Sequence, residues 1–144
     1  MPSDENPPVR DFLDRLEQRR LSQKESFHES VSERRQIGER FRQVQEQAIL
    51  PALGEVGREL ERRGHHPKVR NEGSTVTFTV GVKGVNPKIG VLRFRLLDDP
   101  ADQIRVDFEG VVLLQTRYRV KLSEFTRKLA TRLTLHFTEA LLKD

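Results

Sequence analysis

The sequence predicts a two-layer α+β fold with N-terminal helices, a four-stranded antiparallel meander and a C-terminal helix packed on one sheet face. Three observations predict it. Apolar residues recur at helical spacing before residue 63, at every second position between residues 76 and 118, and at helical spacing again after residue 123. Helices at the two ends of a run of strands are typical of the α+β class. The chain has 144 residues and no cysteine, which is long enough to form one core without disulfides.

The chain is expected to divide into three parts. Residues 1–8 are polar and contain three prolines, so they are predicted to be a disordered lead. Residues 9–50 are expected to form a helical arm or a helical hairpin, and residues 51–144 the α+β core domain. The start of the chain lacks the basic and apolar segments of a secretory signal, and we expect a cytoplasmic protein.

A short amphipathic helix is predicted over VRDFLDRLEQRR, followed by a second helix over residues 22–63 that Gly64 closes. The apolar stripe of the second helix rotates by roughly 100° close to Pro51, where a proline commonly kinks a helix. The later stripe is expected to pack on the sheet. The earlier stripe is expected to contact the first helix or another subunit, which gives a candidate protein interface formed by Ile37, Phe41 and Val44.

Four strands are predicted over residues 76–82, 92–96, 104–108 and 112–118. A five-residue turn over residues 98–102 sets three apolar pairs opposite each other, namely Leu96 with Ile104, Phe94 with Val106, and Leu92 with Phe108. The last helix is expected to run from an N-cap at Ser123 to about residue 142. Its apolar arc consists of Phe125, Leu129, Leu133, Phe137 and Leu141.

Charge is concentrated in the second half of the chain. Residues 1–63 have a net charge of −1 and residues 64–144 of +5. The stretch QTRYRVKLSEFTRKLATR holds six candidate contacts to an anion or a nucleic acid, Arg117, Arg119, Lys121, Arg127, Lys128 and Arg132. The strand register sends the first three to the face opposite Tyr118, whereas Lys128 and Arg132 line the outer side of the last helix. Ordinary solvated faces are the alternative interpretation.

The same register gathers four aliphatic residues on the helix-free sheet face, Ile89, Val91, Val111 and Leu113. An exposed aliphatic cluster suggests a contact with a second copy or a protein partner. Two alternatives remain open: the N-terminal segment covers the cluster, or a bulge at Gly110 turns the last strand inward.

No catalytic constellation is recognisable. The aspartates of the 98–102 turn lack calcium-loop spacing, Asp107 and Glu109 lack the lysine expected beside them in a nuclease, and His65 and His66 lack a partner at zinc-ligand spacing. No cofactor or metal is expected. The sequence therefore predicts a small noncatalytic interaction or adaptor domain that forms a homo-oligomer and has no membrane partner. A nucleic-acid-associated protein is the alternative, and a small-molecule-binding domain a weaker one.

Overall fold

The computed structural model describes residues 7–143, with the side chains of residues 8–24 and 31–143. The chain divides into two units, residues 1–36 and 37–144. The elements are α1 (Pro7–Val44), a π-helical turn η1 (Gln45–Ile49), α2 (Leu50–Arg62), β1 (His66–Asn71), β2 (Thr75–Val82), β3 (Lys88–Leu96), β4 (Gln103–Glu109), β5 (Arg117–Lys121), a 3₁₀ turn η2 (Leu122–Glu124) and α3 (Arg127–Leu142). None of the described helices is long and apolar enough to span a bilayer. Residues 1–6 of the expected disordered lead lie outside the described residues.

The described part of the first unit is helical throughout. The two helices expected there are one, because α1 continues through residue 21 without a break. Its apolar side chains at Val9, Phe12, Leu13 and Leu16 are exposed.

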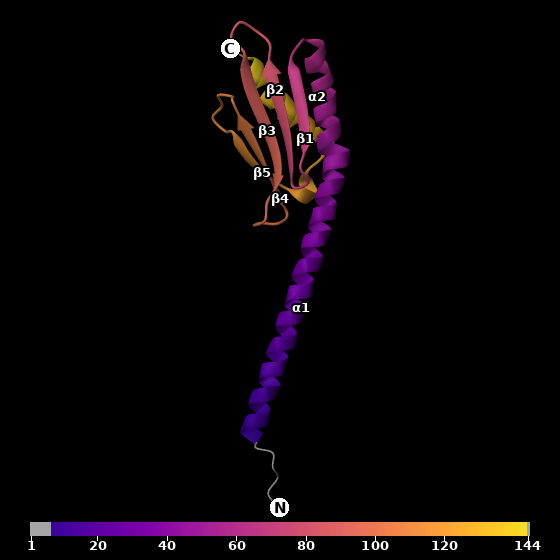
Figure 1. Cartoon of the computed structure of the whole chain (residues 1–144), viewed down its shortest axis with the longest axis vertical. Coiled ribbons are helices and arrows are strands. Elements are labelled where there is room, and N and C mark those ends of the chain that lie inside the picture. Colours follow the sequence, from indigo (N-terminus) through magenta and orange to yellow (C-terminus); the bar gives the residue numbers. More distant parts are fainter. Residues whose placement is uncertain (1–6, 144) are drawn as a thin grey trace, which may run out of the picture. The chain divides into compact units, whose positions relative to one another are not determined.

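The second unit contains a five-stranded antiparallel sheet in the order β1-β2-β3-β4-β5 (Figure 1). The prediction of an α+β fold with an antiparallel sheet is confirmed, but the predicted count of four strands is wrong. The additional strand, β1, has the sequence HPKVRN and is almost entirely exposed. An edge strand that buries little carries no apolar alternation, and it tolerates Pro67 because one side of it needs no hydrogen-bonded neighbour.

The predicted register between β3 and β4 is confirmed, since Leu96, Phe94 and Leu92 pair with Ile104, Val106 and Phe108. The last strand differs from the prediction. It begins at Arg117 rather than near residue 112, and the segment before it is a loop. Gly110 has φ +77, and a Cβ there would lie 2.3 Å from the Ile89 carbonyl oxygen, so the chain leaves the sheet at a position that only glycine fits.

Both helices of the second unit cover one face of the sheet. Figure 1 shows α3, in yellow, behind the sheet, with the helix-free face turned toward the reader. Apolar side chains of α2, α3 and the inward strand positions form one core, including Leu53, Leu60, Val76, Phe78, Leu92, Phe94, Ile104, Val106, Phe137 and Leu141. Helix α3 lies so close to Gly90 that a Cβ on this residue would be 2.7 Å from Leu141 Cδ1.

The π-helical turn explains why the apolar stripe rotates near Pro51. The Leu50 N–H donates to the Gln45 carbonyl, five residues earlier, directly before the proline that cannot donate. This wide turn holds about one residue more than an α-helical turn, which rotates the side chains of α2 by roughly 100° relative to those of α1. The two stripes therefore meet on one face, and Phe41 and Leu60 are buried in the same core.

This finding corrects the expectation of a separate partner for the earlier stripe. Phe41 is 2% exposed, and Ile37 and Val44 are half-buried against the core, so these three residues are not a free protein interface.

Of two predicted helix ends, one is confirmed and the other is wrong. As predicted, Gly64 closes α2: it has φ +87, and the next residue, His65, donates its N–H to the Leu60 carbonyl at 3.0 Å. The predicted N-cap of α3 at Ser123 is wrong. The hydroxyl of Thr126 accepts from the Leu129 N–H at 3.2 Å instead, because residues 122–124 form a separate 3₁₀ turn.

Candidate nucleic-acid interface

The helix-free face of the sheet carries the side chains that alternate with the core residues. On β3, β4 and β5 these outward positions include five arginines, Arg93, Arg95, Arg105, Arg117 and Arg119. Arg95 pairs with Arg105 across β3 and β4, and Arg105 pairs with Arg119 across β4 and β5. Neighbouring strands lie about 4.8 Å apart, so three arginines start from adjacent positions in one row. Like charges directly opposite each other destabilise a sheet, and a row of three is costly without an anion to bind.

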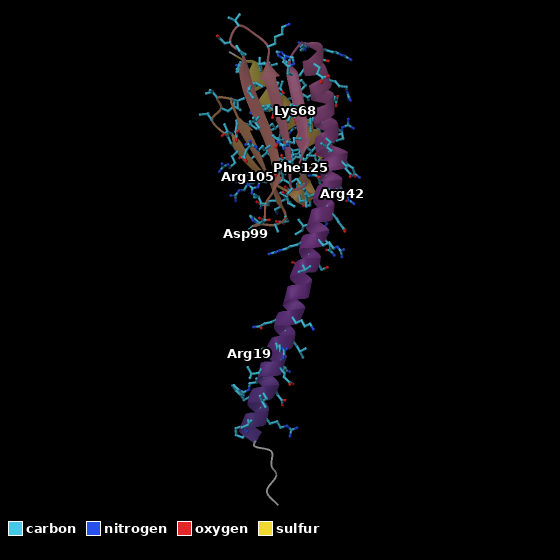
Figure 2. The ribbon with its side chains drawn as sticks, viewed as in Figure 1. Arg19, Arg42, Lys68, Asp99, Arg105 and Phe125 are labelled. Atoms are coloured by element: carbon cyan, nitrogen blue, oxygen red, sulfur yellow. The ribbon has the colours of Figure 1, made fainter. Side chains whose placement is uncertain are left out.

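The arginine row belongs to a larger basic surface, which we call the basic face. Its cations come from four of the strands and consist of Lys68, Arg70, Arg93, Arg95, Arg105, Arg117, Arg119 and Lys121. Figure 2 labels two of them, Lys68 and Arg105. Three carboxylates, those of Glu72, Asp107 and Glu109, form ion pairs with these cations. Eight cations and three carboxylates leave a net charge of +5.

The ion pairs of the basic face are centred on Asp107. Its side chain is only 15% exposed, and its two oxygens accept from Arg105 Nε and Arg117 Nε, each at 2.9 Å. Arg93 is paired with Glu109. Asp107 thus orients two guanidinium groups through charge-assisted hydrogen bonds.

Four cations of the basic face have no ion pair within the described part of the chain, namely Lys68, Arg95, Arg119 and Lys121. Arg95 and Arg119 are exposed at the two ends of the arginine row. A groove of about 630 Å³ opens over this region, lined in part by Thr75, Arg95 and Arg105. The acidic turn with Asp98, Asp99 and Asp102 directly follows β3, so the basic face ends beside these carboxylates.

Only half of the six predicted anion contacts lie on the basic face. Arg117, Arg119 and Lys121 are on β5. The other three, Arg127, Lys128 and Arg132, are exposed residues of α3, which covers the opposite face of the sheet. Arg127 is within 3.6 Å of Glu55 on α2. The six residues therefore form two separate groups.

The predicted aliphatic cluster is not a single exposed patch. Ile89 is exposed and Val91 half-buried, while Val111 and Leu113 are half-buried against the core. The loop after Gly110 turns these two inward, as one of the alternatives proposed.

The loop turns two other residues outward. Val112 and Leu114 are 98% and 111% exposed. Its base is closed by a hydrogen bond from the Phe108 N–H to the Thr116 carbonyl at 2.8 Å. The loop therefore displays two apolar side chains to solvent.

The sequence interpretation missed Arg93, Arg95 and Arg105 as members of a basic surface. A signal was present, because the register that sets Leu96 opposite Ile104 also sets Arg95 opposite Arg105. These arginines lie outside the basic stretch in sequence. Strand pairing places Arg105 directly opposite Arg119, and Arg95 directly opposite Arg105.

The chemistry of the basic face favours oxyanions. Arginine keeps its charge at any physiological pH, and its planar guanidinium donates in pairs to phosphate oxygens. The described residues contain no group of three or more His, Cys, Asp or Glu side chains that could hold a metal ion. No protein-family model, curated protein or solved structure matches this chain. The functional conclusion therefore depends on the basic face itself.

Proposed function

We propose that this chain is a noncatalytic binding protein whose basic face holds the phosphate backbone of a nucleic acid. The observation that carries the proposal is the row Arg95–Arg105–Arg119, whose two outer members have no ion pair within the described residues. A bound backbone supplies the negative charge that the row lacks. It also spans several cations at once, as a single small anion does not.

The composition of the face favours binding without base recognition. No Phe, Tyr or Trp occupies an outward position in β1 to β5 of the described sheet, where arginine, lysine and threonine predominate. Proteins that bind nucleic-acid bases usually stack them on aromatic side chains, whereas contacts to phosphate carry no sequence information. We therefore expect similar affinity for oligonucleotides of different sequence.

The test is fluorescence anisotropy with labelled oligonucleotides over a range of salt concentrations. Arg95→Ala combined with Arg119→Ala should reduce the slope of log affinity against log salt by about two units, roughly one for each lost phosphate contact. The matched control combines Lys128→Ala with Arg132→Ala, which removes the same charge from α3. Circular dichroism verifies that both variants fold.

Two results would overturn the proposal. One is the absence of binding at low salt. The other is an equal loss of salt slope in both double variants, because net charge rather than the arginine row would then determine the association.

A second candidate function is self-association, for which the exposed loop residues Val112 and Leu114 give specific support. Two exposed apolar side chains on one loop suit contact with the same loop of a second copy. Light scattering after size exclusion tests it. A monomeric mass at high protein concentration argues against this candidate and leaves the nucleic-acid proposal intact.

A further inference from the structure

The outward side of β2 forms a column of threonines, Thr75, Thr77 and Thr79, all half-buried. Each has a cation directly across on a neighbouring strand. Thr77 lies between Arg70 of β1 and Arg93 of β3.

The other two threonines continue the pattern. Thr75 pairs with Arg95 of β3, and Thr79 pairs with Lys68 of β1. Short hydroxyl side chains thus run along the middle of this part of the sheet. Cations lie on both sides of Thr77, on the β3 side of Thr75 and on the β1 side of Thr79, which has Val91 on its β3 side.

The spacing of this threonine column defines what can lie on it. Strands β1 and β3 are each about 4.8 Å from β2, so the two rows of cations start roughly 10 Å apart. Successive threonines are about 6.8 Å apart along the strand. One sugar-phosphate backbone can rest on this floor and meet cations from both sides. A duplex is a convex cylinder, so it meets the tips of the long side chains and stays clear of the threonines.

The ion pairs beside the column do not close it. Arg70 is paired with Glu72 at 2.7 Å, and Arg93 with Glu109, but both carboxylates are more than half exposed. Exposed ion pairs of this kind contribute little free energy, so phosphate oxygens can replace the carboxylates at small cost.

We infer that the ligand is a single polynucleotide strand. One part of it runs along β2, with its phosphates between the two rows of cations, and at Thr75 the strand turns and crosses β3 to β5 over the arginine row. The inference rests on the proposed function and specifies the class of nucleic acid. The threonine hydroxyls donate to phosphate oxygens, and in RNA they can also pair with the 2′-hydroxyl. Single-stranded DNA and RNA share the backbone chemistry, and the experiment includes both.

The experiment compares affinities of the full chain for single-stranded DNA, single-stranded RNA and duplex DNA of the same sequence at one salt concentration. The single strands should bind more tightly than the duplex. Thr75→Val combined with Thr77→Val removes two hydroxyls at nearly constant shape. Each lost hydrogen bond should weaken single-strand binding roughly 2- to 10-fold. Duplex affinity should not change. Valine is also a good strand former, so the fold is retained.

Thr131→Val on α3 is the control, because its hydroxyl donates to the Arg127 carbonyl away from the sheet. Duplex binding as tight as single-strand binding overturns the inference, and so does a double variant with unchanged single-strand affinity. In either case salt-dependent binding that requires Arg95 and Arg119 leaves the proposed function standing. If neither form of nucleic acid binds, the proposed function fails together with the inference. A preference for RNA over DNA that the double variant loses identifies the 2′-hydroxyl as the contact.

Discussion

Arg105 of β4 and Arg119 of β5 occupy directly opposing positions in the sheet, and both point away from the core. The nearest carboxylate partner, Asp107, pairs with Arg105 and with Arg117 and leaves Arg119 without an ion pair in the described structure. The sheet thus places two like charges opposite each other. An acidic or neutral side chain in place of Arg119 would make the folded state more stable. Such a conflict between stability and charge is expected at a binding site.

Replacing Arg119 should therefore move stability and binding in opposite directions. Arg119→Glu converts a like-charge cross-strand pair with Arg105 into an attractive one and should raise the free energy of unfolding by about 0.2–1 kcal/mol. The same change should weaken nucleic-acid binding. Urea unfolding followed by the fluorescence of Tyr118, the single tyrosine of the chain, measures the first effect, and anisotropy the second.

Arg117→Glu is the matched control on the same strand. It sets a glutamate opposite Asp107 and breaks an existing ion pair, so it should lower the free energy of unfolding. A shift of the same sign in both variants would mean that cross-strand charge does not control stability on this face.

The sequence predicts an element of this fold only where that element buries a regular pattern of apolar side chains. Strands β2, β3 and β4 each bury one face, so their alternation predicts both their existence and the pairing of Phe94 with Val106. The edge strand β1 buries little and gives no such signal. In the run VVLLQT after Gly110, apolar residues are continuous, so periodicity cannot tell which side chains point inward.

The site is predictable only in part for a related reason. Arg117 and Arg119 stand out because they are close together in sequence. Arg95 and Arg105 reach them only through strand pairing, Arg105 from the neighbouring strand β4 and Arg95 from β3 beyond it. The helical region illustrates the same limit. The sequence shows that the apolar stripe rotates beside Pro51, but two separate packing partners and a single π-helical turn both explain that rotation. The shared core of the structure shows that the π-helical turn is the cause.

Phe41 should contribute to the core as much as residues beyond the π-helical turn do. Phe41→Ala should lower the free energy of unfolding of the second unit by about 3–5 kcal/mol, comparable with the roughly 2–5 kcal/mol expected for Leu60→Ala. Urea unfolding followed through Tyr118 reports on this unit. The neighbouring Arg42→Ala is the control: the side chain is 78% exposed and should change stability by less than about 0.5 kcal/mol. A loss in Phe41→Ala as small as that in Arg42→Ala would contradict a shared core.

The last prediction concerns the loop between β4 and β5, whose side chains alternate between half-buried and exposed. Val111→Lys and Leu113→Lys each place a charge against the core and should lower the free energy of unfolding by roughly 0.5–3 kcal/mol. Val112→Lys and Leu114→Lys change fully exposed side chains in the same loop and should shift it by less than about 0.5 kcal/mol. Thermal unfolding and mass in solution are measured together. If the outward pair lowers the mass while the fold persists, the loop joins two copies. If the inward pair leaves stability unchanged, the loop is not packed as described, and the turn at Gly110 does not direct it.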